Sequence, residues 1–212
     1  ATMDSHGKLT MTSTGDFVIG YPDRAPDDFL QSVGEVLSTV VPVKLTDNFM
    51  GHLYAKLIIN SCITSLGAIC GLYLGRMLSI KKVRKIFIEI IREAVLIADK
   101  LNIRIEVFGD KLNFYKFLSG NNIIADLRRH LFIMVIGFKY RKLKSSSLQS
   151  LERGKLTEID YLNGYIVKNA DRFHLEVPVN RAVVNIIHEI EQGKRKISFN
   201  NFSDPIFDRF NN

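Results

Sequence analysis

Two groups of polar side chains in this sequence have types and spacings that could support chemistry. In the first group, Lys56, Asn60 and Thr64 recur at every fourth position of an otherwise apolar run. On a helix this spacing places all three side chains in a line on one face. A cation and a carboxamide on an apolar helix need polar partners, which indicates a ligand site. The alternative is a lysine whose stem is buried while its ammonium reaches water.

The second group is the stretch Lys144–Gly164, which is rich in hydroxyl, amide and carboxylate side chains. Within it, Thr157 precedes three apolar residues at helical spacing: Ile159, Leu162 and Ile166. This pattern predicts that Thr157 is the N-cap of a helix and that Glu158 and Asp160 lie in its first turn. The helix dipole favours carboxylates there and fixes their place, so either acid could be directed at a ligand. More often, acids in a first turn serve only to stabilise the start of the helix.

The composition is that of a folded protein with an excess of basic residues. The chain has 212 residues, of which 46% are apolar, and a formal net charge of +7. This length suits one large domain or one and a half ordinary ones. The charge favours anionic partners, and basic clusters occur at 81–85 and 139–144. No DNA-binding motif accompanies these clusters, so we do not expect nucleic acid to be a partner.

The cysteines and the apolar runs indicate where the protein works. Cys62 and Cys70 would lie about 12 Å apart on one helix, which is too far for a disulfide, so we expect buried thiols in the cytoplasm. Polar residues such as Lys56 and Asn60 interrupt the apolar run 55–75, which favours a buried core helix over a membrane span. We therefore expect no membrane partner. No His or Cys cluster has metal-ligand spacing, and the polar start has no apolar signal core.

The N-terminal residues 1–45 are predicted to form a small αβ piece. Residues 8–20 alternate apolar and polar side chains around Gly15–Asp16, so we expect a strand, a turn and a second strand. A proline at a helix start, followed by an apolar stripe, predicts a helix over 26–39. Residues 41–45 should be extended, because the residue before a proline avoids the helical region.

From residue 46 onward the sequence reads as helix, so the predicted fold class is mainly α. Apolar residues at helical spacing predict helices at 47–70, 79–101, 111–118, 122–140, 158–173 and 178–193. Ser79 is expected to cap the second of these helices. We expect residues 46–195 to form one all-helical domain and residues 196–212, which are mostly polar, to form a tail.

Four segments of the sequence together carry a family resemblance. They are Tyr54 with Lys56 and Asn60 on the long helix, Ser145–Ser150, Thr157–Gly164 and Val177–Asn180. Together they resemble the C-terminal domain of the ketopantoate reductase (2-dehydropantoate 2-reductase) family, over about residues 15–195. The resemblance implies a multi-helix fold of the 6-phosphogluconate dehydrogenase C-terminal type, preceded by a remnant of a Rossmann domain.

The chemistry implied by this resemblance is NADPH-dependent reduction of a 2-oxo acid, in pantothenate and coenzyme A synthesis. Carried over by position, Lys56 would be the general acid. Glu158 would orient this lysine and contact the substrate hydroxyl and the cofactor, while Asn60, Thr64 and Ser146 would bind the substrate. An ammonium beside a carbonyl that receives a hydride offsets the developing negative charge and supplies the proton.

The sequence departs from the family pattern in the substrate region and in the nucleotide region. Thr64 stands where the family often has a second asparagine, and Ser150 stands where it has an acid. A relative that acts on another 2-oxo acid is therefore an open alternative. In addition, no Gly-x-Gly-x-x-Gly follows a strand near the start, although hydride chemistry needs a dinucleotide cradle.

The chain thus looks like the C-terminal part of such an enzyme, either a cloned fragment or a truncated gene product. Residues 1–45 would then be the last strands and helix of the nucleotide-binding domain. We expect the chain to be a homodimer and to be inactive alone. The alternative is a non-catalytic helical interaction and dimerisation domain that keeps only the scaffold. An enzyme should bring Lys56 and Glu158 within hydrogen-bond reach at a cleft, whereas a scaffold should leave them on separate surfaces.

Overall fold

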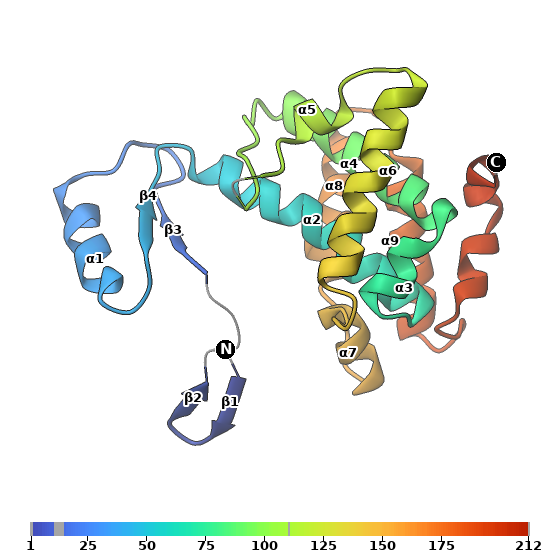
Figure 1. Cartoon of the computed structure of the whole chain (residues 1–212), viewed down its shortest axis with the longest axis horizontal. Coiled ribbons are helices and arrows are strands. Elements are labelled where there is room, and N and C mark those ends of the chain that lie inside the picture. Colours follow the sequence, from blue (N-terminus) through green and yellow to red (C-terminus); the bar gives the residue numbers. More distant parts are fainter. Residues whose placement is uncertain (1, 11–14, 110, 212) are drawn as a thin grey trace. The chain divides into compact units, whose positions relative to one another are not determined.

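The computed structural model describes residues 2–10, 15–109 and 111–211. Its internal contacts divide the chain into two compact units, Ala1–Leu53 and Tyr54–Asn212 (Figure 1). The first unit holds the short strands and one helix, and the second is helical. The predicted fold class, mainly α after a small αβ piece, is confirmed.

The strands of the first unit pair differently from the prediction. Strand β1 (Thr2–Ser5) pairs with β2 (Lys8–Thr10) antiparallel, whereas β3 (Phe17–Ile19) pairs with β4 (Val43–Leu45) parallel. The predicted hairpin of residues 8–20 is therefore wrong in its pairing, and residues 11–14 of its turn lie outside the described residues.

Helix α1 accounts for the pairing of β3 with β4, a strand far along the sequence. Parallel strands need a crossover connection, and α1 (Asp28–Ser38) supplies one between β3 and β4. Gly34 lets the helix approach the strands, since a Cβ added there would lie 3.2 Å from Cδ1 of Leu45. The predicted helix over 26–39 is confirmed to within two residues at its start.

The predicted helix 47–70 is confirmed as α2 (Phe49–Cys70), the central helix of the second unit. By length and composition α2 could cross a membrane, but 72% of its most apolar window is buried inside the protein, as in a core helix. The first turn of α2 belongs to the N-terminal unit, so the units divide later than residue 45. Gly20 approaches this turn closely, since a Cβ there would lie 3.0 Å from that of Phe49.

Seven further α-helices complete the described part of the second unit. They are α3 (Leu74–Ser79), α4 (Lys81–Lys100), α5 (Phe114–Leu118), α6 (Ile123–Lys139), α7 (Ser146–Glu152), α8 (Asn163–Arg172) and α9 (Pro178–Glu191). The predictions for 122–140 and 178–193 are confirmed. Ser79 does not cap α4, because it ends α3 and its hydroxyl donates to the Arg76 carbonyl oxygen at 2.8 Å.

The predicted helix 158–173 is broken near its start. A 3-10 helix, η1 (Ile159–Tyr161), precedes α8, and Leu162 between them has φ −106° and ψ −101°, outside the helical region. Thr157 lies before η1, and its Oγ1 accepts from the Ile159 N–H at 3.2 Å. The predicted N-cap position of Thr157 is thus wrong for the α-helix, because the chain turns at Leu162.

The segment predicted as a polar tail is folded onto the helices. It forms two 3-10 helices, η2 (Phe199–Ser203) and η3 (Pro205–Phe210). Phe202 and Phe207 are 1% and 0% exposed, and their ring centroids lie 6.0 Å apart. The side-chain amide of Asn201 also donates to the Ile69 carbonyl oxygen at 3.0 Å. The aromatic rings in this otherwise polar segment therefore complete the core.

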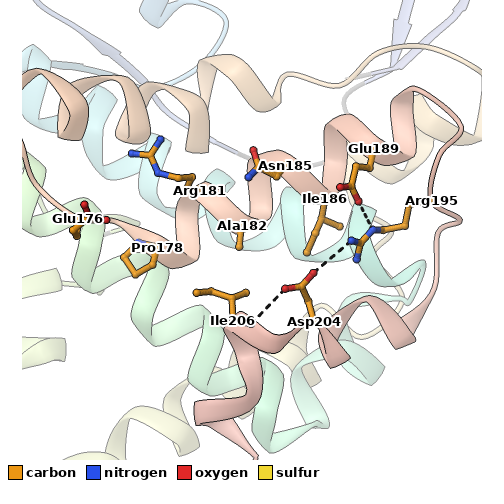
Figure 2. Close-up of a pocket in the computed structure, with 10 residues that line it drawn as sticks. All are labelled: Glu176, Pro178, Arg181, Ala182, Asn185, Ile186, Glu189, Arg195, Asp204 and Ile206. Atoms are coloured by element: carbon orange, nitrogen blue, oxygen red, sulfur yellow. Dashed lines mark hydrogen bonds and ion pairs between the residues drawn. The ribbon is translucent and has the colours of Figure 1, made fainter.

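Ion pairs fix the same segment to α9, beside a hollow of about 350 Å³ (Figure 2). Arg195 donates from Nε to Glu189 at 2.6 Å and from Nη2 to Oδ2 of Asp204 at 3.4 Å. Because Arg195 pairs with both carboxylates, these three lining residues of the hollow offset one another's charge. None of the predicted site residues lines it.

Candidate active site

The polar line predicted on α2 is present and becomes more buried toward its C-terminal end. Lys56 is exposed, Asn60 is half-buried and Thr64 is buried. The Thr64 hydroxyl donates to the Asn60 carbonyl oxygen at 2.7 Å. That hydroxyl oxygen can still accept a hydrogen bond, and the Asn60 amide offers both donor and acceptor atoms.

The start of α7 packs directly on this part of α2. The Ser145 hydroxyl caps α7 by accepting from the Leu148 N–H at 3.2 Å, and it donates to the Thr64 carbonyl oxygen at 3.2 Å. Gly67 permits this approach, since a Cβ there would lie 2.6 Å from the Ser145 oxygen. Ser146, which is exposed, follows directly. The predicted Ser146 is therefore the direct neighbour in sequence of the residue that contacts the Thr64 backbone.

Ser145 and Gly67 were not among the predicted site residues. The sequence did hold a signal for Gly67. Glycine inside a helix lowers the stability of the helix, so a glycine in this long apolar run indicates that another segment packs closely there. Ser145 carried no signal that set it apart from Ser146 and Ser147, because only the fold decides which hydroxyl faces α2.

A buried chain of hydrogen bonds fixes the start of α8 against α2. The Ser65 hydroxyl donates to Oδ1 of Asn163 at 2.6 Å. Nδ2 of Asn163 donates to the Ser61 carbonyl oxygen at 3.2 Å and to Oδ1 of Asn180 at 2.9 Å. Asn163 and Asn180 have no exposed surface. The asparagines of the sequence motifs at 157–164 and 177–180 thus hold the scaffold together.

This chain of hydrogen bonds ends at Glu93 on α4. Its two oxygens accept from the N–H groups of Val179 and Asn180, at 2.9 Å and 2.8 Å, and from Nδ2 of Asn180 at 2.7 Å. Burial raises the pKa of the Glu93 carboxyl, and the hydrogen bonds from Asn180 and Val179 partly oppose that rise. The carboxylate lies at the N-terminus of α9, where the helix dipole favours it. Periodicity alone did not single out Glu93.

Glu158 is held between two anchored neighbours. The backbone N–H and hydroxyl of Thr157 both donate to Oε1 of Glu191, at 2.7 Å and 2.8 Å, and Ile159 is buried. Asp160, the other acid of the motif, lies 2.9 Å from Nε2 of His188. Asp160 is therefore engaged with α9, whereas Glu158 is exposed and available to a ligand.

Lys56 and Glu158 do not contact each other. Within the described part of the chain, neither side chain makes a hydrogen bond or an ion pair, so the expected bond between them is not formed. An exposed pair of this kind gains little free energy in water, because ordering two long side chains offsets their attraction. Their predicted catalytic roles stay predictions.

The described residues do not supply a phosphate cradle at α1 or a metal site. The Asp27 carboxylate fills the N-terminus of α1 by accepting from the Leu30 N–H at 3.0 Å. That hydrogen bond is the main cause of the lowered pKa of Asp27, and an acid at this position repels phosphate. No group of three or more His, Cys, Asp or Glu side chains among the described residues is placed to hold a metal ion.

Comparisons with known proteins agree on one family. The sequence profile described as "Ketopantoate reductase PanE/ApbA C terminal" matches residues 48–191. The 2-dehydropantoate 2-reductase of Pyrococcus horikoshii is 27% identical over 181 residues, which are 85% of this chain and 54% of that protein. The chain spans about half the length of the curated relatives it matches.

Two solved structures share the fold. The PanE/ApbA family ketopantoate reductase of Ralstonia eutropha is 27% identical, with a TM-score of 0.68 over 86% of this chain and 53% of that one. D-mandelate dehydrogenase, in a ternary structure with NADH and anilino(oxo)acetate, is 16% identical. Its TM-score is 0.71, over 91% of this chain and 57% of that one.

Proposed function

Because the chain belongs to the ketopantoate reductase family through its C-terminal domain, we propose that it is the substrate-binding and proton-donating half of a 2-oxo acid reductase. The substrate would be 2-dehydropantoate or a close relative, reduced in pantothenate and coenzyme A synthesis. The observation that carries the proposal is the bond from the Ser145 hydroxyl to the Thr64 carbonyl oxygen. It joins the serines of α7 to the polar line of α2, where substrate groups would be held.

The proposed roles follow from what each side chain can offer. Asn60 presents a donor and an acceptor, and the Ser146 hydroxyl presents both as well. The Thr64 hydroxyl gives its proton to the Asn60 carbonyl oxygen and so presents an acceptor. This set suits a carboxylate and a hydroxyl on one small molecule. Lys56, at the exposed end of the line, would donate its proton to the carbonyl oxygen as that oxygen becomes an alkoxide. Glu158 would hold the substrate hydroxyl and orient Lys56 once a ligand draws the two together.

The hydride donor is proposed to be NADPH, held by residues other than those present here. The N-terminus of α1 does not suit a pyrophosphate, because the Asp27 carboxylate occupies this place and accepts the hydrogen bond of the Leu30 N–H. We therefore expect no NADPH oxidation by this chain alone in the presence of 2-dehydropantoate. The buried free thiols of Cys62 and Cys70 support a reducing, cytoplasmic location.

Direct ligand binding tests this proposal without requiring turnover. Calorimetric titration of the chain with 2-dehydropantoate should give saturable binding, and Asn60→Ala should weaken it about tenfold, as expected for a lost hydrogen bond to a charged ligand. Asp160→Asn is the matched control, because that acid is engaged with His188. Absence of saturable binding, or equal affinity for both variants, would overturn the substrate assignment.

A second candidate function is a non-catalytic helical interaction domain. The missing contact between Lys56 and Glu158 favours it, because a scaffold has no need to bring the two together. This alternative predicts no 2-oxo acid binding at all, so the same titration separates the two functions.

A further inference from the structure

A buried cluster of basic side chains lies where α4 and α6 pack on each other (Figure 1). Its members are Arg84 on α4 and Arg129 and His130 on α6, which are 8%, 5% and 8% exposed. None of them belongs to the candidate substrate site. Buried cations ordinarily have an anion within hydrogen-bond reach, because burial removes the water that would otherwise solvate them. The hydrogen bonds of these three side chains show whether this cluster has one.

The two arginines direct hydrogen bonds at backbone carbonyl groups. Nη1 of Arg84 donates to the Leu78 carbonyl oxygen at 2.9 Å. Nη1 of Arg129 donates to the carbonyl oxygens of residues 118–120, at distances between 3.0 and 3.2 Å. A carbonyl group is a dipole without net charge. These bonds therefore fix the positions of the guanidinium groups but do not neutralise them.

His130 and Arg129 each keep one buried N–H group that has no acceptor. Nδ1 of His130 accepts from Nε of Arg84 at 3.1 Å, so the proton of the neutral ring is on Nε2. Within the described part of the chain, neither this Nε2 nor Nε of Arg129 makes a hydrogen bond, although both atoms are buried. A buried donor without an acceptor costs free energy. Two such donors on one helix indicate a place for an acceptor.

Both donors face the same group, the carboxylate of Asp126. Its Oδ1 lies 3.8 Å from Nε of Arg129, and its Oδ2 lies 3.6 Å from Nε2 of His130. Both separations exceed the upper limit of an ordinary N–H···O bond, which is about 3.2 Å. Side chains on a helix lean toward its N-terminus, so the short side chain of Asp126 leans away from donors one turn later. An oxyanion that is not attached to the helix could approach both donors more closely.

The charge around His130 is more positive than Asp126 alone can offset. Burial lowers the pKa of His130, and the negative charge of Asp126 opposes this shift. The cations that lower the pKa of the ring further are Arg84, Lys85 and Lys81, all on α4. Cations gathered in this way attract anions.

Arg129 lies in a similar field. Burial lowers the pKa of its guanidinium, and Asp126 again opposes the shift. Arg92 and Arg128 add to the lowering, although the carboxylate of Glu89 lies 3.3 Å from Nε of Arg92 and offsets part of its charge. The single charge of Asp126 thus faces several cations, which favours an anion that carries more charge.

We propose that Arg129, His130 and Arg84 form an oxyanion site for a phosphate group, either inorganic phosphate or the phosphate of a small phosphorylated molecule. Nε of Arg129 and Nε2 of His130 donate to two of its oxygens, and Arg84 holds the ring in the tautomer that donates. A phosphate group offers several strong acceptor oxygens and about two negative charges near neutral pH. Asp126, whose side chain is 54% exposed, turns to solvent when phosphate binds. The proposal does not depend on the proposed function, because it uses none of the candidate substrate residues.

Removing the charge of Asp126 tests the site without altering the buried cluster. In calorimetric titration of the whole chain with inorganic phosphate at pH 7.5, Asp126→Asn should bind about tenfold more tightly than the wild type, because the competing carboxylate has lost its charge. Asp23→Asn makes the same change in net charge at an exposed position of the first unit and should change the affinity less than about twofold. No saturable binding by Asp126→Asn, or an equal gain in Asp23→Asn, would overturn the proposal.

Substitution of Arg129 tests the location. Arg129→Gln should weaken phosphate binding at least about tenfold, because it removes both the cation and the directed donor. Lys168→Gln is the control, since it removes the same charge from an exposed position on α8. Arg129→Lys keeps the charge without the planar fork, so its affinity should lie between those of Arg129→Gln and the wild type. Thermal unfolding shows which variants fold. Wild-type affinity in folded Arg129→Gln or Arg129→Lys would place the phosphate elsewhere.

A comparison of anions identifies the source of the phosphate group. Glycerol 3-phosphate should match inorganic phosphate if the site takes phosphorylated molecules, whereas binding of inorganic phosphate alone would assign the site to the free ion. Acetate carries only the charge that Asp126 already supplies, so it should bind much more weakly than either. Acetate binding as tight as that of phosphate would contradict the assignment of a phosphate site.

Discussion

Asn163 donates a hydrogen bond of 2.9 Å from its side-chain amide to the side-chain oxygen of Asn180, and neither residue has any exposed surface. Through this bond the first residues of α8 and α9 are joined, and both are connected to α2 and α4 by Ser65 and Glu93. The candidate substrate residues lie on α2 and before α8. Their relative position therefore depends on a buried polar network rather than on contacts between the site residues themselves.

Asn163→Ala should destabilise the fold by about 2–4 kcal/mol. The substitution leaves the Ser65 hydroxyl and the Asn180 side-chain oxygen buried without partners, and each orphaned group costs about 1–3 kcal/mol. Urea unfolding measures the free-energy change. Asn185→Ala removes an amide from an exposed position and should change stability by less than about 0.5 kcal/mol. A similar small effect for Asn163→Ala would mean that the network does not stabilise the fold.

Phe202→Ala should destabilise the fold by about 3–5 kcal/mol, because it empties a fully packed site. Phe202 is 1% exposed, whereas Phe199, in the same 3-10 helix, is 39% exposed. Phe199→Ala is therefore the matched control and should cost clearly less. Thermal and urea unfolding of both variants provide the comparison. Equal small losses would show that residues 196–212 behave as a tail after all.

The contrast between Phe202 and the helices shows what the sequence could and could not predict. Apolar residues at helical spacing were sufficient for α2 and α9, because each buries a long stripe. Residues 196–212 have only scattered phenylalanines and no period, so nothing local distinguished buried rings from exposed ones. Ser79 failed as a cap for a similar reason, because the short α3 before it gave no separate signal.

The site was predictable in its residue types but not in its connections. The spacing of Lys56, Asn60 and Thr64 fixed their common face, since a helix has only one geometry. The position of Asn163 opposite Asn180 depends on how α8 and α9 pack, which local patterns do not encode. The same holds for the Ser145 hydroxyl on α2.

The direction of the stability change in Gly67→Ala tests how tightly α7 packs on α2. In a helix interior, alanine is favoured over glycine by about 1 kcal/mol. The new Cβ would lie 2.6 Å from Oγ and 2.8 Å from Cβ of Ser145, and overpacking costs about 1–3 kcal/mol. We therefore expect a net loss of stability by urea unfolding, together with weaker 2-oxo acid binding. A more stable variant would show that α7 moves freely on α2.

Acidification should destabilise the protein through His130. Nδ1 of His130 accepts from the buried Arg84 guanidinium at 3.1 Å, and burial lowers the pKa of the ring below its usual value of 6.5. Asp126, 3.6 Å from Nε2, opposes this shift. The folded state therefore favours the neutral ring. The stability that neutral His130 contributes is fully present above about pH 6.5 and is lost as the pH falls toward the pKa of the ring in the folded state.

The melting temperature, measured from pH 7.5 downward, checks this dependence. His130→Asn can place an oxygen where Nδ1 lies and cannot titrate, so its melting temperature should fall less steeply than that of the wild type between pH 6.5 and 5. His188→Asn is the control, because that ring is 38% exposed and lies beside Asp160. Parallel curves for His130→Asn and the wild type would rule out His130 as the titrating group.

Lys56→Gln should weaken binding of a 2-oxo acid about fivefold and reduce the salt dependence of that binding. Both effects follow from loss of an exposed cation beside an anionic ligand, an attraction worth about 1 kcal/mol that salt screens. Lys168→Gln removes the same charge from an exposed position on α8, so it controls for the change in net charge. Titration at two salt concentrations separates the variants. Equal changes in affinity and salt dependence for the two variants would mean that only the net charge of the protein affects binding. That result would contradict the proposed position of Lys56 beside the substrate oxygen.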